Sequence, residues 1–226
     1  MTPRRYLRAV ALVAGKDLRA ELRTKRVLGA SLAFALLVVV AFSFTFVRAV
    51  ESLRPVAHGA LWLSFLFAGT LATTRAAAVE ARDGALEGLL LAPVDRSAVY
   101  LGKVLSTTLF VVAIELVSLA GVVVFLDYAP PAGALVAVLA VLVLAAAGFA
   151  ATGVVLSLVA SRSGLSGTLV PVLLFPLVVP LLLSGIELTR ALVVGRPVGG
   201  WARILLGYDA VLLLASALLF EYVVEG

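Results

Sequence analysis

The sequence predicts an all-α polytopic membrane protein with six transmembrane helices, preceded by an amphipathic N-terminal helix at the membrane interface. Hydrophobic residues make up 63% of the 226 residues and charged residues only 14%, and the mean hydropathy is +1.17. Soluble domains rarely have such a composition. A helix needs about 20 apolar residues to cross about 30 Å of hydrocarbon, and segments of that kind occupy residues 27–47, 56–79, 104–126, 133–160, 165–183 and 204–224. Only short connections remain, so we expect one transmembrane domain over residues 1–226.

Residues 1–26 are expected to form a helix that lies on the membrane. Thr2 before Pro3 is typical of a helix start, and a signal peptide is excluded because the following apolar run is longer than about 7–15 residues. Glu21 precedes Lys25 by four residues, a favourable helical spacing for an ion pair. The apolar and basic residues lie on largely opposite sides: Leu7, Val10, Ala11, Ala14, Leu18 and Leu22 against Arg8, Lys16, Arg19, Arg23 and Arg26. The alternative is a solvated basic segment that only fixes the topology.

Lysine and arginine concentrate in the N-terminal segment and in the second and fourth connections. The positive-inside rule then places both termini in the cytoplasm. The formal net charge of +5 is explained by contact with anionic lipid headgroups, so we expect membrane lipid and no nucleic acid as a partner.

Residues 80–103 are expected to form a cytoplasmic coupling loop. Acidic residues share one helical face there and leucines another, until Pro93 ends the helix, and Asp95 opens the next one. Such a loop can dock a soluble partner and carry its motion to the spans, whereas the alternative is an ordinary hairpin with a charged, solvated turn. The candidate coupling residues are Glu80, Arg82, Asp83, Gly84, Leu86, Glu87, Gly88 and Pro93.

Two carboxylates lie inside predicted spans, Glu115 in the third and Asp209 in the sixth. A charge within the membrane costs about 2.5–3.5 kcal/mol even on the lenient insertion scale, so both should face protein. They would line a dimer interface or contact a partner subunit. Alternatively, each is an acid satisfied by Ser, Thr or backbone groups, with Tyr208 as a neighbour that can bond Asp209.

The fifth span contains Pro171, Pro176 and Pro180, which remove backbone donors and should kink the helix. Residues 184–203 are expected to form a long periplasmic connection with short re-entrant elements. Turn-forming glycines and Pro197 favour this interpretation, and Trp201 should anchor the start of the last span.

The chain offers little for cofactor chemistry. Cysteine is absent, and His58 is the only histidine; beside Trp62, one turn further along, it is interpreted as a polar anchor at the outer end of the second span, not as a heme ligand. A phosphate-binding Walker A loop ends in Gly-Lys-Ser/Thr, whereas Lys16 and Lys103, each after a glycine, are followed by Asp and Val. This chain is therefore not expected to hydrolyse ATP by that chemistry.

Four runs in the same order resemble the heme exporter protein B (CcmB) family of ABC-2 type exporter permeases: KDLRAELRTKR at 16–26, the coupling loop with SAVYLGK at 97–103, PVLLFPLVVP at 171–180 and LFEYVVE at 219–225. The resemblance implies a permease subunit in the bacterial inner membrane, forming a homodimer and paired with a cytoplasmic ABC ATPase. It also implies a heme-handling membrane protein and a small single-span subunit as partners, and heme as a possible cargo. In that family, ATP hydrolysis is associated with release of a heme-loaded periplasmic chaperone.

Three other functions are alternatives. A generic exporter of lipids or drug-like molecules would share the entry helix, the coupling loop and the six spans. An intramembrane enzyme would need a converging cluster of His or carboxylate side chains, and the two embedded acids are far apart in sequence. A passive scaffold is the third. We expect a non-catalytic subunit that holds no cofactor strongly.

Overall fold

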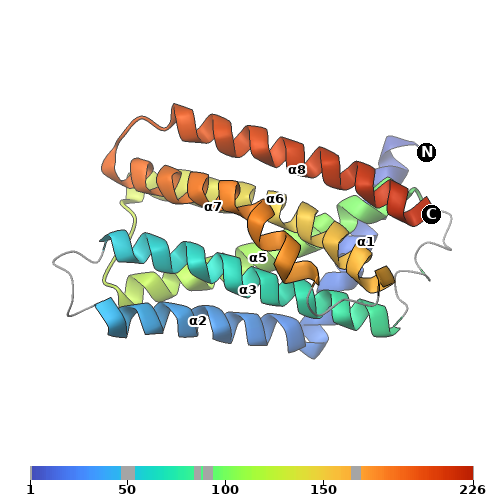
Figure 1. The fold of residues 1–226 in the computed structure, drawn as a ribbon, viewed down its shortest axis with the longest axis horizontal. Helices are drawn as coiled ribbons and strands as arrows, with labels where there is room; N and C mark the ends of the chain where they lie inside the picture. Colours follow the sequence, from blue (N-terminus) through green and yellow to red (C-terminus); the bar gives the residue numbers. More distant parts are fainter. Residues whose placement is uncertain (1, 47–53, 84–87, 89–93, 164–168, 226) are drawn as a thin grey trace.

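The computed structural model describes residues 2–46, 54–83, 88, 94–163 and 169–225 (Figure 1). Within these ranges the chain forms long helices and no strand, which confirms the predicted fold class. The helices are α1 (Pro3–Thr24), α2 (Arg26–Phe46), α3 (Arg54–Asp83), α5 (Arg96–Phe125), α6 (Ala132–Ser163), α7 (Leu169–Val194) and α8 (Gly199–Glu225).

In the described part of the chain, six helices are long and apolar enough to cross a membrane, namely α2, α3, α5, α6, α7 and α8. Their axes run side by side, and α1 lies at the end of the bundle that carries both chain termini (Figure 1). We call this the terminal end. Large apolar side chains such as Leu37, Val124 and Leu214 are exposed along the outside, as expected where helices face lipid.

The centre of the bundle is an aromatic stack that joins α3 to α6. Phe65 lies edge to face with both Trp62 and Phe149, at ring-centroid distances of 5.5 and 5.1 Å, a geometry that aromatic quadrupoles favour. All three side chains are fully buried. Trp62 is therefore a core residue and not the interfacial residue that the sequence suggested.

The connection after the fifth span is much shorter than expected. Helix α7 continues to Val194 and α8 begins at Gly199, so the predicted connection at 184–203 consists mostly of helix. The stop is set by Gly195, whose positive φ of 73° allows the Arg196 amide to donate to the Ala191 carbonyl at 2.8 Å, the usual glycine-terminated helix end. Only residues 195–198 remain between the helices, in place of re-entrant elements.

Prolines do not end α7 either, because Pro176 and Pro180 lie inside it. Hydroxyl groups bond carbonyls near these positions: Ser184 donates to Pro180 at 2.8 Å and Tyr208 to Leu177 at 2.7 Å. Such bonds help a proline-containing helix to persist in the membrane. Tyr208 thus bonds α7, and not Asp209 as the sequence suggested.

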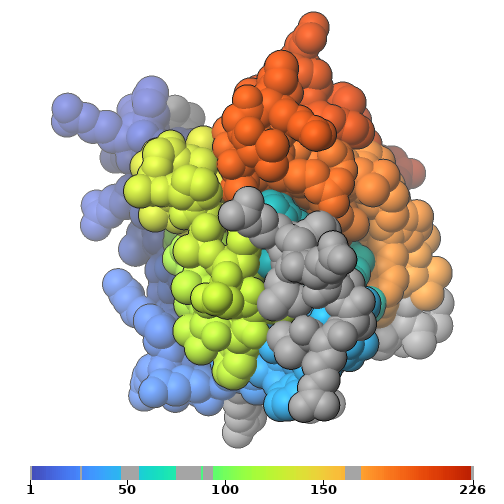
Figure 2. Space-filling view, turned by 90° about the vertical axis from the view of Figure 1, so that its left-hand side faces the viewer, coloured from blue at the N-terminus to red at the C-terminus, as the bar shows by residue number. Residues whose placement is uncertain are grey.

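The end opposite the terminal end carries the α5–α6 and α7–α8 connections, which lie at the surface there (Figure 2). Asp127 adopts a positive φ of 47° in the first of these turns. The two connections described at this end are short. Helix α1, the last turn of α3 and the first turns of α5 lie at the terminal end.

Candidate functional site

Helix α1 is docked on the bundle through one face. Ala9, Val13 and Ala14 are buried, and their main contact is α5. Leu7, Ala11 and Leu22 of the predicted apolar stripe remain exposed, on a neighbouring face of the same helix. Helix α1 therefore combines a protein-facing side with an apolar side that is free to enter the membrane interface.

Gly102 sets the crossing point of α1 and α5. A Cβ atom at this position would lie 2.6 Å from the Cβ of Val13 and 3.0 Å from the Val10 carbonyl oxygen. Two helix backbones approach this closely only where one of them lacks a side chain. Tyr6 adds a hydrogen bond to Ser97, with 3.0 Å between the hydroxyl oxygens.

A carboxylate of α1 also meets two polar groups of α5. The Oδ2 atom of Asp17 lies 3.9 Å from the Lys103 Nζ and accepts a hydrogen bond from the Ser106 hydroxyl at 3.4 Å, while Oδ1 pairs with Lys16 at 2.8 Å. The Lys103 side chain is buried, and a buried ammonium group requires a counter-charge. Asp17 provides it from the neighbouring helix.

Glu21 joins α1 to the start of the first span. Its Oε1 atom accepts hydrogen bonds from the backbone amides of Val27 and Leu28 at 2.8 and 2.7 Å, and the residue is buried. These are two of the amides that a helix start leaves without a partner. The predicted pair with Lys25 is replaced by this cap: Lys25 adopts φ 51° in the turn between the helices and its side chain is exposed.

The other basic residues proposed for the interfacial helix stay at the surface. Arg19 and Arg23 are exposed, and Lys16 is exposed beside its partner Asp17. Their exposure agrees with the predicted amphipathic pattern and leaves them available to lipid headgroups.

Part of the predicted coupling loop lies outside the described residues, namely Gly84, Leu86, Glu87 and Pro93. Glu80, Arg82 and Asp83 belong to the last turns of α3, so the first part of the loop continues the second span. Gly88 is exposed. The docking role of these eight residues stays a prediction.

The chain re-enters the described structure at Val94, and Asp95 then caps α5. The Oδ1 atom of Asp95 accepts hydrogen bonds from the Ser97 hydroxyl at 2.7 Å and from the Ser97 amide at 3.0 Å. These two bonds hold the pKa of the Asp95 carboxyl below its ordinary value of 3.8, because they stabilise the charged form. The predicted helix start after Pro93 is confirmed, and α5 runs without interruption from this cap into the third span.

The two intramembrane acids lie on different helices. Glu115 of α5 and Asp209 of α8 are both buried, and neither carboxylate has a hydrogen-bond partner among the described residues. Asp209 occupies the space above Gly148, where a Cβ atom would collide with its carboxylate. The partners expected from Ser, Thr or backbone groups are therefore absent from the described contacts, and a role at an interface stays a prediction.

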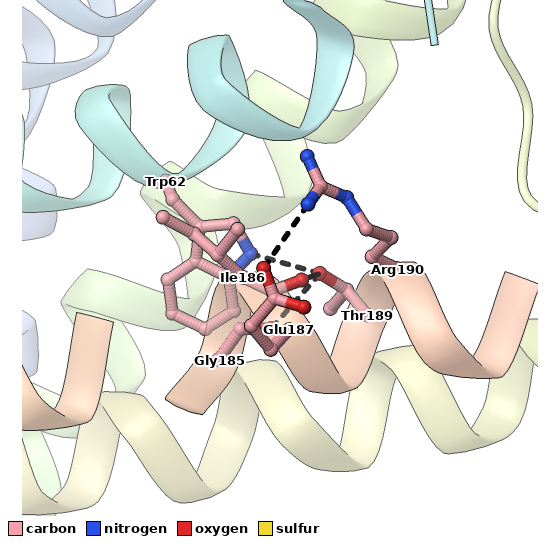
Figure 3. A network of polar contacts seen from close by, with 6 residues as sticks. All are labelled: Trp62, Gly185, Ile186, Glu187, Thr189 and Arg190. Carbon is pink, nitrogen blue, oxygen red and sulfur yellow. Dashed lines mark hydrogen bonds and ion pairs between the residues drawn. The ribbon is translucent and has the colours of Figure 1, made fainter. Parts of the chain in front are cut away.

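A second polar network holds α3 against α7 (Figure 3). The indole N–H of Trp62 donates to the Thr189 hydroxyl at 3.1 Å, and the Trp62 ring packs directly on Gly185. One turn of α7 also carries an ion pair between Glu187 and Arg190, 3.1 Å apart. This network stabilises the helix pair in the part of α7 that the sequence had assigned to a connection.

His58 is buried near the start of α3, and its Nε2 atom lies 3.3 Å from the Tyr128 hydroxyl. The two rings also contact each other, with centroids 5.2 Å apart. Within the described residues, no three His, Asp or Glu side chains gather closely enough to hold a metal ion. Through this contact the imidazole joins the start of α3 to the connection between α5 and α6.

Sequence reasoning missed the residues that fasten α1: Tyr6, Asp17, Gly102, Lys103 and Ser106. No periodicity distinguishes them, because their contacts join positions about 90 residues apart. Glu21 was recognised, but with the wrong partner. An acidic residue shortly before an apolar helix is a usable sign of a cap, since negative charge is favoured near a helix N-terminus.

Comparisons with known proteins cover most of the chain. The family model described as CcmB protein matches residues 8–225, from the second turn of α1 to the end of α8. The chain is also 35% identical over 177 residues to the heme exporter protein B of Rhodobacter capsulatus, and the match covers 77% of the chain and 79% of that relative.

Proposed function

Because the chain belongs to the CcmB protein family, we propose that it is the transmembrane subunit of an ABC transporter complex for cytochrome c biogenesis. In this proposal, a separate soluble subunit binds and hydrolyses ATP. The present chain couples hydrolysis to heme export or to release of a heme-loaded periplasmic chaperone. The name of the relative, heme exporter protein B, supports heme as the cargo and favours this function over export of lipids or drug-like molecules.

The observation that carries the proposal is the attachment of α1 to the first turns of α5. Pro93 is the last of the candidate coupling residues, and two residues later Asp95 caps α5. Ser97, Gly102 and Lys103 of the following turns all contact α1. A displacement of the loop therefore acts first on the α1–α5 pair.

From that pair the displacement would reach two spans. Helix α5 is itself the third span, and Glu21 ties the end of α1 to the first turn of α2. Rigid-body movement of packed helices is a common way of transmitting such a signal, because packed interfaces shift as units. In this proposal, α1 transmits the displacement of the loop to the first and third spans.

The arrangement of charge supports a cytoplasmic terminal end. Most of the basic residues of α1 lie there with both termini, and so does Arg96 at the start of α5 (Figure 1). By the positive-inside rule this end faces the cytoplasm of a bacterial inner membrane. The ATPase would dock here, while a heme-handling membrane protein, a small single-span subunit and a second copy of this chain would contact the sides of the bundle.

The test is charge reversal in the coupling loop. Glu87→Lys, in the complex assembled with its native partners, should weaken co-purification of the ATPase or uncouple its activity. The expected cost is about 1–3 kcal/mol, as for loss of a charge pair at an interface. Glu221→Lys is the matched control, since Glu221 is an exposed acid in α8 near the same end.

Both variants must insert into the membrane in normal amounts. Unchanged ATPase association and activity in Glu87→Lys would leave the loop as an ordinary solvated hairpin. An ATPase whose activity is indifferent to the presence of this subunit would point to a passive scaffold. If coupling fails but heme and chaperone release are normal, the assignment to cytochrome c biogenesis is wrong.

A further inference from the structure

A groove of about 340 Å³ lies between α1 and the residue that precedes the cap of α5. Its lining consists of an apolar floor and a cationic rim, with no acidic residue among them: Ala9, Leu12, Val13 and Val94 form the floor, and Arg5, Arg8 and Lys16 form the rim. The volume lies within the range of about 300–1,000 Å³ that is usual for sites of small molecules.

The positive charge of the rim favours binding of an anion. Within the described structure, Arg5 and Arg8 make no ion pair, whereas Lys16 shares the Asp17 carboxylate. Three cationic groups on one face thus have a single described counter-charge. The planar guanidinium group of arginine suits phosphate particularly well, because two of its N–H groups can donate hydrogen bonds to one phosphate.

The apolar floor favours a ligand that carries an apolar chain beside its anionic group. Leu12 is 60% exposed and lies beside the three basic residues that line the groove, so α1 presents an apolar side chain next to the cationic rim. A helix of this kind lies at the level of the headgroups, with its apolar side toward the acyl chains. Free phosphate would satisfy the rim but would leave the floor in contact with water.

We propose that this groove binds an anionic phospholipid. Its phosphate lies against Arg5, Arg8 and Lys16, and the upper part of an acyl chain lies along Leu12, Val13 and Val94. Because Val94 directly precedes the Asp95 cap, the bound lipid bridges α1 and the start of α5. The lipid therefore reinforces the same helix pair that Gly102 and Asp17 hold together.

The experiment titrates the purified full-length chain, in neutral detergent, with phosphatidylglycerol and counts bound lipids by native mass spectrometry. A basic side chain near an anionic surface strengthens binding by a factor of about five. The variant R5Q/R8Q should therefore bind phosphatidylglycerol about 25-fold more weakly than the unmodified chain. R4Q/R19Q is the matched control, since it removes two exposed charges of the same helix that do not line the groove, and its affinity should stay within about threefold.

Leu12→Trp tests the floor without changing the charge. It should fill the groove and reduce phosphatidylglycerol binding by about tenfold or more. Phosphatidylcholine and inorganic phosphate serve as probes for an apolar chain and an anion alone, and both should bind weakly. Far-UV circular dichroism and gel filtration show whether each variant keeps its fold.

Equal loss in the two double variants would overturn the proposal, because it would show general attraction to a basic surface. Normal binding by Leu12→Trp would refute the acyl-chain position, and saturable binding of inorganic phosphate would replace the lipid by a free anion. If lipid binding survives in R5Q/R8Q while the ATPase no longer co-purifies, the groove is a protein contact and the proposal is wrong.

Discussion

The cap that Glu21 places on α2 leads to a local and quantitative prediction. Replacing Glu21 with alanine removes the only acceptor that the described structure provides for the Val27 and Leu28 amides at the start of the first span. The rest of α2 keeps its own backbone hydrogen bonds. The first turn of α2 should therefore open more often, while the bundle stays folded.

The magnitude follows from the two hydrogen bonds of 2.8 and 2.7 Å to one buried carboxylate. Loss of a helix cap typically costs about 0.5–2 kcal/mol, and a hydrogen bond to a charged group contributes about 1.5–3 kcal/mol. Water will partly replace the carboxylate, so we expect about 2 kcal/mol. Since about 1.4 kcal/mol is a factor of ten, the opening equilibrium should shift about 30-fold.

Hydrogen exchange followed by mass spectrometry measures this opening in peptides that cover residues 25–30. Glu21→Ala should exchange about 30-fold faster there, and Glu21→Gln, which keeps an acceptor oxygen but loses the charge, about fivefold faster. Asp17→Asn is the control, because Asp17 contacts α5 and not α2. Equal exchange at residues 25–30 in Glu21→Ala and Asp17→Asn would refute the cap.

Three further predictions test other parts of the molecule. A reporter fused after Gly226 should give a cytoplasmic signal and one inserted at Pro130 a periplasmic signal, since basic residues gather at the terminal end; opposite signals would overturn the orientation. His58→Ala should leave the heme content of the purified complex nearly unchanged, measured together with subunit recovery, and loss of most heme would place a ligand there. Gly185→Ala should lower the free energy of unfolding by about 1–3 kcal/mol, because its Cβ would meet the Trp62 ring; Trp62→Phe should relieve part of that cost, and strictly additive losses would contradict the contact.

The spans could be predicted because membrane insertion imposes a simple requirement on sequence. A helix such as α6 needs a long apolar run to cross hydrocarbon, and the predicted segment 133–160 almost coincides with Ala132–Ala160. The predicted end of the fifth span was wrong because the turn signals were extended too far back along the chain. The glycines and Pro197 that favoured a long connection lie only at residues 195–200, whereas Glu187 and Arg190, three residues apart, pair on one side of a helix that continues to Val194.

The candidate site could be predicted only in part. The amphipathic pattern identified α1 and its exposed basic residues, and Asp95 was recognised as a helix start. The partners were not predictable, because a glycine gives no sign of what will fill the space above it. Gly148 is covered by the Asp209 carboxylate and Gly185 by Trp62, in each case a residue from a distant part of the chain.

Close packing at Gly102 also limits how α1 can move. To slide along α5, α1 would have to bring a residue other than Gly102 under Val13, and a Cβ atom there would lie well inside contact distance. The Asp17 carboxylate would at the same time leave the buried Lys103, which is costly for a desolvated charge. Helix α1 and the first turns of α5 therefore move as one body. In the proposed coupling, a force applied at the loop would tilt this body and, through Glu21, would pull on the first turn of α2. The interfacial helix would then transmit movement in addition to fixing the topology.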